Sequence, residues 1–177
     1  METFTAIKDF VDNPHFYEQR RKSLNELDLT MIDAPIVEIN KGFSKLPYCF
    51  TLQSCYGHFL YGNQRNPKNI EPLPISDNIE KAEYRIAYIA FCIENSESGI
   101  ELFHDLNKIT VINPEYIQFG CAEWFWKRQV NSFALQVEPK RFMKRDKAII
   151  DYQEALRVEK VRNEFFEEIE KIVQVKG

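Results

Sequence analysis

The residues best suited to chemistry lie close together at positions 51–58, where the sequence reads TLQSCYGH. Cys55 and His58 stand between two stretches typical of β-strands, so we expect them at an exposed turn. A thiol near a cationic imidazole has a lowered pKa and can act as a nucleophile. The structural alternative is a plain β-turn, in which Gly57 permits an unusual backbone angle and Ser54 bonds the local backbone. We predict ligand contact at this turn, with catalytic candidates Cys55 and His58 and substrate-binding candidates Ser54, Tyr56 and Gly57.

A basic cluster follows later in the chain, at positions 140–147. Its sequence, KRFMKRDK, has five basic residues and one acid in eight positions. We expect the cluster just before, and within, the first turn of the last helix. Basic side chains and the free N–H groups of a helix N-terminus suit an anion, although a solvated surface turn is the simpler alternative. The candidates for holding a phosphate are Lys140, Arg141, Lys144 and Arg145.

The remaining aromatic, histidine and cysteine residues give weaker signals. Trp124 and Trp126 lie two positions apart on a predicted strand, so they would share one face of it. There they would stack bases or, as is more common, pack in the core or in a homo-oligomer interface. His15 and His104 have no partner at metal-ligand spacing, and the four cysteines contain no CxxC pair, so no metal site is expected. The motifs of P-loop NTPases, α/β-hydrolases and zincins are also absent from the sequence.

Composition indicates one globular domain over residues 1–177, since 44% of the residues are hydrophobic and 28% are charged. The net charge of −4 argues against a dedicated nucleic-acid binder, but a local basic patch can still hold a phosphate. No apolar run approaches the roughly 18 residues that span a bilayer, and the first residues lack a signal-peptide pattern. We therefore expect a cytoplasmic protein with reduced cysteines and no membrane partner.

Hydrophobic periodicity and turn residues divide the chain into helices, strands and one long loop. The predicted helices are residues 14–27, 36–42, 98–109 and 144–173, the predicted strands are 48–53, 58–61, 86–93, 116–126 and 132–138, and the loop is 62–83. This order mixes hairpins with one crossover helix. The predicted fold class is α/β (α+β), a single domain with a mixed sheet of about five strands covered by helices, ending in a long C-terminal helix.

Three segments in the first third of the chain resemble consecutive elements of one known family. Residues 16–27 form a polar helix pattern, residues 33–36 (DAPI) an acidic-Pro-Ile segment, and residues 48–57 (YCFTLQSCYG) a strand that runs into a turn. Together they are similar to the tRNA wybutosine-synthesising protein 3 family of methyltransferases, whose turn reads Ser-Ser-Cys-Ser-Gly-Arg. The later order of strand, helix, two strands and long helix also resembles that family.

The turn keeps three of the family's residues, Ser54, Cys55 and Gly57. It has Gln53, Tyr56 and His58 where the family has Ser, Ser and Arg. The resemblance implies that S-adenosylmethionine is the methyl donor and that a tricyclic base precursor in tRNA is the acceptor.

Three functional hypotheses follow. The first is an RNA-modifying methyltransferase dependent on S-adenosylmethionine, with the turn lining the pocket, the basic cluster holding phosphates and His58 acting as a base. The second is a non-catalytic binding or interaction protein that keeps only the fold and forms an oligomer. The third is a cysteine enzyme in which Cys55 reacts.

Overall fold

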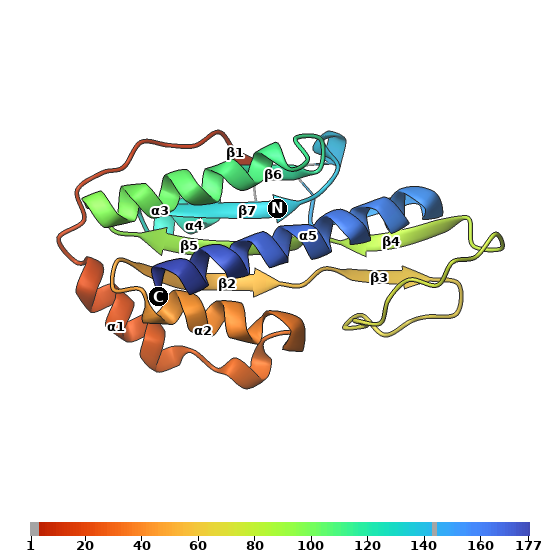
Figure 1. Ribbon diagram of the computed structural model, residues 1–177, viewed down its shortest axis with the longest axis horizontal. Helices are drawn as coiled ribbons and strands as arrows, with labels where there is room; N and C mark the ends of the chain where they lie inside the picture. Colours follow the sequence, from red (N-terminus) through yellow and green to blue (C-terminus); the bar gives the residue numbers. More distant parts are fainter. Residues whose placement is uncertain (1–3, 143–144) are drawn as a thin grey trace.

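The computed structural model describes residues 4–142 and 145–177, which form helices and antiparallel strands (Figure 1). The strands are β1 (Phe4–Thr5), β2 (Cys49–Cys55), β3 (His58–Tyr61), β4 (Lys81–Arg85), β5 (Ala87–Ile93), β6 (Ile117–Ala122), β7 (Ser132–Val137) and β8 (Lys147–Asp151). The α-helices are α1 (Phe16–Glu26), α2 (Val37–Lys45), α3 (Glu97–Asn107), α4 (Glu123–Arg128) and α5 (Tyr152–Lys176). Short 3-10 turns are η1 (Leu29–Met31), η2 (Ala34–Ile36), η3 (Lys108–Val111) and η4 (Lys140–Phe142).

The strands form two sheets. A five-stranded sheet has the order β1-β6-β7-β5-β2, and a three-stranded sheet has the order β3-β4-β8. The predicted α+β class, the sheet of about five strands and the long C-terminal helix are confirmed. The pairings within both sheets are antiparallel rather than mixed, and the second sheet was not predicted.

The two sheets are joined through one long, interrupted hairpin. Strands β2 and β3 follow each other in the chain but pair with different partners, β5 and β4. Cys55 lies opposite Tyr88, and His58 lies opposite Arg85, so the register is the same on both sides of the gap. In Figure 1, β3 accordingly continues the line of β2, and β5 continues the line of β4. The exposed turn expected at Cys55 and His58 is therefore wrong: the chain passes from one sheet to the other there, and His58 is buried.

We call this gap, residues 56–57 with residues 86–87, the sheet junction. Gly57 has a φ of 89°, which favours glycine, and its carbonyl oxygen accepts a hydrogen bond of 3.1 Å from Nη1 of Arg162 on α5. Across the gap, the buried Tyr84 hydroxyl accepts from the Ala87 N–H at 2.9 Å and donates to the Val137 carbonyl at 2.6 Å. Side chains thus satisfy backbone groups that the ladder leaves unpaired.

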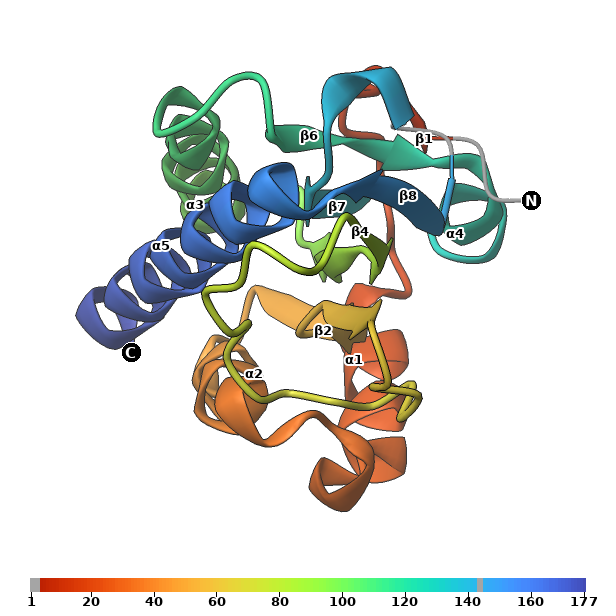
Figure 2. The same ribbon diagram turned by 90° about the vertical axis from the view of Figure 1, so that its right-hand side faces the viewer.

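Helix α5 spans the junction and packs on both sheets. It contacts β7 of the large sheet and β4 and β8 of the small one, and the views in Figures 1 and 2 agree that it lies along both. Its buried residues recur every three or four positions, which is the period of a helix face: Val158, Val161, Phe165, Ile169 and Val173. The main hydrophobic core is accordingly continuous across the two sheets.

Two sequence predictions about the second half of the chain are wrong. The strand β6 ends at Ala122, and residues 123–128 form α4, so Trp124 and Trp126 lie on a helix rather than on one face of a strand. The last helix begins at Tyr152 instead of near residue 144, because residues 147–151 form β8. In β8 the burial alternates with Ala148 and Ile150 inward, and this period of two is that of a strand.

The long loop is held against the molecule at several points. It runs over residues 62–80, since residues 81–83 belong to β4. The backbone N–H of the buried Leu73 donates to Oε2 of Glu159 at 2.8 Å, and the Tyr152 hydroxyl donates to the carbonyl of Pro74. Both partners lie on α5, so the same helix that supports the sheets also fixes the loop.

We expect Gly57→Ala to lower the free energy of unfolding by about 2–3 kcal/mol, because a Cβ there would be strained by the positive φ and would lie 2.9 Å from the Cβ of Ala87. Gly62→Ala is the matched control, since Gly62 also has a positive φ but a Cβ added there would meet nothing within 4 Å. It should cost about 1 kcal/mol. Urea unfolding measures both values, and equal losses would show that the junction does not require the close approach.

Candidate functional site

A pocket of about 540 Å³ opens at the sheet junction. Its lining comes from both sheets, from η1, from the long loop and from α4. The apolar and aromatic part of the wall includes Phe4, Met31, Ile86, Tyr88, Trp124 and Phe125, and the cationic part includes Lys68, Arg85 and Arg145. A pocket of this size, with aromatic walls and a few polar groups, is typical of a small-molecule site.

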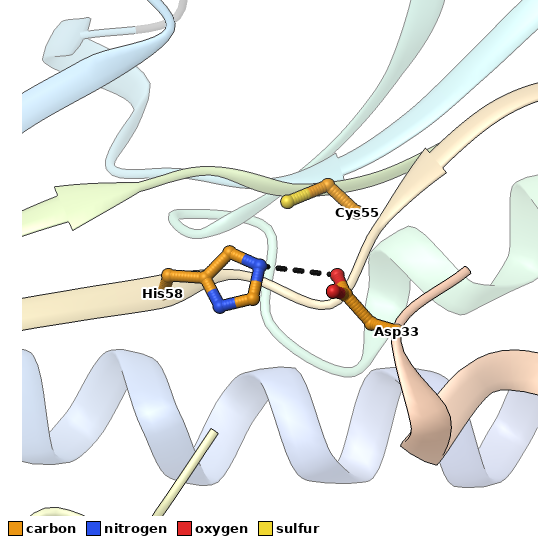
Figure 3. A group of neighbouring side chains, drawn as sticks. All are labelled: Asp33, Cys55 and His58. Carbon is orange, nitrogen blue, oxygen red and sulfur yellow. Dashed lines mark hydrogen bonds and ion pairs between the residues drawn. The ribbon is translucent and has the colours of Figure 1, made fainter. Parts of the chain in front are cut away.

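Three side chains that can react or bind a metal meet in this pocket: Asp33, Cys55 and His58 (Figure 3). Their potential ligand atoms, a carboxylate oxygen, the thiol sulfur and an imidazole nitrogen, all lie within 4.8 Å of one another. Cys55 ends β2 and His58 begins β3, so the interrupted hairpin brings these two together. Asp33 lies in the segment directly before η2. We call these residues the polar triad.

His58 is held by an acceptor on each side of its ring. Its Nδ1 lies 3.0 Å from the carbonyl oxygen of Asn69 in the long loop, and its Nε2 lies 3.1 Å from Oδ2 of Asp33. A carbonyl and a carboxylate can only accept, so both ring nitrogens donate and the imidazole is cationic. The hydrogen bond to Asp33, followed by that to Cys55, raises the pKa of the buried His58 to about 10, although burial opposes this shift.

Asp33 is held in turn by the sheet junction. Its Oδ2 accepts a hydrogen bond of 2.8 Å from the backbone N–H of Tyr56. Burial pushes the pKa of Asp33 upward, but the hydrogen bonds from His58 and Tyr56 lower it more, so its pKa lies below the ordinary value. His58 and Asp33 therefore form an ion pair. A neutral His58 with a free lone pair, which the base hypothesis requires, does not fit this arrangement.

The predicted turn residues divide into two groups. Ser54 and Cys55 line the pocket with His58, and the Ser54 hydroxyl accepts a hydrogen bond of 3.2 Å from the Asn40 amide. Tyr56 and Gly57 are outside the pocket lining. The guanidinium of Arg162 lies 3.9 Å from the centre of the Tyr56 ring, and this contact supports the junction.

The predicted basic cluster is separated by the fold. Arg145 lines the pocket, whereas Arg141 forms an ion pair with Glu154 and Lys140 is exposed on η4 outside the pocket lining. Lys144 lies outside the described residues. The expected place of this cluster at the N-terminus of the last helix is wrong, since β8 separates this segment from α5. The structure adds Arg85 and Lys68, which no local pattern in the sequence indicated.

Glu138 is a fully buried carboxyl group behind the pocket wall. Its Oε2 accepts a hydrogen bond of 3.1 Å from the amide of Gln136, and its Oε1 has no hydrogen-bond partner within the described part of the chain. Burial, aided by the charge of Asp146, raises the pKa of Glu138 to about 8, while Arg145 lowers it. Gln136, Arg145 and Asp146 all line the pocket. Proton uptake at Glu138 therefore affects the electrostatics of that wall.

Comparisons with known proteins find a similar fold. No family model matches the sequence, and no curated protein matches it significantly. Among solved structures, the chain is similar to the PH1069 protein from Pyrococcus horikoshii, with 12% sequence identity and a TM-score of 0.50. The match covers 91% of this chain and 93% of that one. At this identity the likeness concerns the fold alone. No helix within the described ranges is long and apolar enough to cross a membrane.

We expect Glu138 to make stability fall as the pH rises from about 4.5 to about 8. In this window the folded protein binds a proton that the unfolded chain has released, so deprotonation favours unfolding, and the loss is complete above the folded-state pKa. The effect should be a few kcal/mol. Glu138→Gln should flatten this part of the pH profile and stabilise the protein above about pH 8.

Urea unfolding at about pH 5.5 and about pH 8.5 measures the difference. Glu164→Gln, at an exposed position on α5, is the control and should keep the wild-type slope. Equal slopes in wild type and Glu138→Gln would contradict the assignment.

Proposed function

We propose that this protein is a methyltransferase that uses S-adenosylmethionine and acts on a base of an RNA, as its resemblance to the wybutosine-synthesising protein 3 family implies. The observation that carries the proposal is the pocket at the sheet junction. Its lining includes Ser54 and Cys55, which match the family's turn, and His58, which stands at the position of the family's Arg.

The pocket walls offer a partner to each part of the donor. The adenine ring stacks on Trp124, a residue that is 42% exposed and whose ring is covered on one face by the guanidinium of Arg128, 3.9 Å from the ring centre. Ribose hydroxyls and the amino group are donors that suit the carboxylate of Asp146 and the amide oxygen of Gln136. The donor's carboxylate suits the guanidinium of Arg145.

The chemistry requires alignment more than activation. A nitrogen of the base attacks the methyl carbon, the carbon–sulfur bond breaks, and the donor leaves as a neutral thioether because its sulfonium takes up the bonding electrons. The proton left on the base passes to water in the open pocket. His58 places a fixed positive charge in the pocket wall. The repulsion between this charge and the sulfonium falls as the methyl group is transferred, because the sulfonium loses its charge. Binding of the RNA uses cations near the mouth, namely Lys68 and Arg85.

The second candidate is a non-catalytic binding protein with the same ligand class. One observation favours it: both nitrogens of His58 are engaged in hydrogen bonds to acceptors, so His58 has no free lone pair with which to act as a base. The two candidates agree on donor binding and differ in turnover. Transfer of a labelled methyl group to RNA supports the enzyme, and binding without transfer supports the second candidate.

We expect S-adenosylmethionine to bind the metal-free protein with a micromolar Kd. Arg145→Ala should weaken binding about 10-fold or more, because one charge-assisted hydrogen bond contributes about 1.5–3 kcal/mol. Cys55→Ala should also weaken binding, because Cys55 lines the same pocket as Arg145. Isothermal titration calorimetry measures the affinities.

The matched control is Arg157→Ala, which removes an exposed arginine on α5 that lies outside the pocket lining. It should bind the donor as the wild type does. Absence of heat at millimolar donor with a folded protein would overturn the methyltransferase proposal, and equal weakening in both arginine variants would overturn the assigned pocket.

A further inference from the structure

We infer that the polar triad is a binding site for a divalent transition metal of the zinc class, held by Asp33, Cys55 and His58 with an open fourth position. The juxtaposition that supports this is a set of three ligand atoms of three types within 4.8 Å of one another. Zinc bonds of about 2.0–2.3 Å place neighbouring ligand atoms roughly 3.2–3.8 Å apart in a tetrahedron. The triad atoms, which lie within 4.8 Å of one another, must therefore move closer together when a metal binds.

The outer contacts of the triad are those that orient metal ligands in proteins. A ligating histidine usually donates its second ring N–H to a carbonyl or carboxylate, which fixes the tautomer and turns the other nitrogen to the metal. Nδ1 of His58 makes such a bond, 3.0 Å long, to the carbonyl of Asn69. Its Nε2 faces Asp33 and Cys55, as Figure 3 shows. The Tyr56 N–H likewise holds the carboxylate of Asp33.

The ligand set indicates the class of metal. A thiolate, an imidazole and a carboxylate together favour Zn²⁺ or Co²⁺ over Mg²⁺ and Ca²⁺, which prefer oxygen ligands alone. Within residues 4–142 and 145–177, no fourth side chain of a metal-binding type joins the group. Three protein ligands with a solvent-facing position are typical of reactive zinc sites, and here that position faces the pocket.

Metal binding replaces the ion pair between His58 and Asp33 with three bonds from the metal to its protein ligands. The metal takes the place of the Nε2 proton of His58 and of the Cys55 thiol proton, and the ion pair between His58 and Asp33 becomes two bonds to the cation. Lys68 opposes binding through its charge, since it acts on Asp33, but it is exposed on the long loop and is free to turn toward solvent. This inference does not depend on methyl transfer, because it concerns only the three side chains and their supports.

The test is a Co²⁺ titration of the full-length, chelator-treated protein. We expect one equivalent of Co²⁺ to give the intense visible absorption of a four-coordinate site and a near-ultraviolet thiolate charge-transfer band, and added Zn²⁺ to abolish both. Cys55→Ser should remove the charge-transfer band, and Asp33→Asn should weaken binding about 10-fold or more. Cys121→Ala, at a buried thiol outside the triad, is the matched control and should keep both bands.

A second measurement uses the wild-type chain alone. Cys55 is the one cysteine with a partly exposed side chain, so Zn²⁺ should slow its alkylation by iodoacetamide at least 10-fold if it is a ligand. A wild type without four-coordinate absorption, a charge-transfer band that persists in Cys55→Ser, or alkylation unaffected by Zn²⁺ would overturn the inference. Donor binding is measured on metal-free protein, so either proposal can fail while the other stands.

Discussion

The imidazole of His58, held between the Asp33 carboxylate and the Asn69 carbonyl, is the interaction on which the site depends. It joins three parts of the chain that are far apart in sequence: the segment before η2, the start of β3 and the long loop. The ring is buried, the Tyr56 N–H holds Asp33, and the Asn69 N–H donates to the carbonyl of Asn66, so the orientation of the ring is defined before any ligand arrives. The loop also binds α5 through Leu73, so the site is linked to the helix that supports both sheets.

The pocket exists because a long hairpin is interrupted without losing its register. At the sheet junction the strands separate, and polar groups that a continuous ladder would satisfy are instead bonded by buried side chains such as Tyr84 and Arg162. Such an arrangement costs free energy in desolvation, which the continuous core offsets, and glycine at position 57 adopts its positive φ without strain. The same opening exposes the triad, the cations and the aromatic wall to one space.

The local patterns of the sequence predicted the fold class and the helices α1, α2, α3 and α5, because these depend on short-range periodicity and turn residues. They could not identify Asp33 as a partner of His58, since the two are 25 positions apart and meet only through tertiary structure. The strand β8 was missed because its alternating pattern runs directly into a helix and begins with a basic residue, Lys147. The segment around Trp124 was misassigned because aromatic residues favour strands by propensity, whereas packing made it a helix.

The measurement that tests this account most directly is nitrogen NMR of the histidine rings in metal-free protein at neutral pH. The account predicts that His58 carries protons on both Nδ1 and Nε2, each with a slowly exchanging signal, because both nitrogens donate to buried acceptors. The exposed His15 and His104 serve as internal references for ordinary imidazoles. A His58 ring with one bare nitrogen at that pH would contradict the double anchoring and, with it, the proposed organisation of the site.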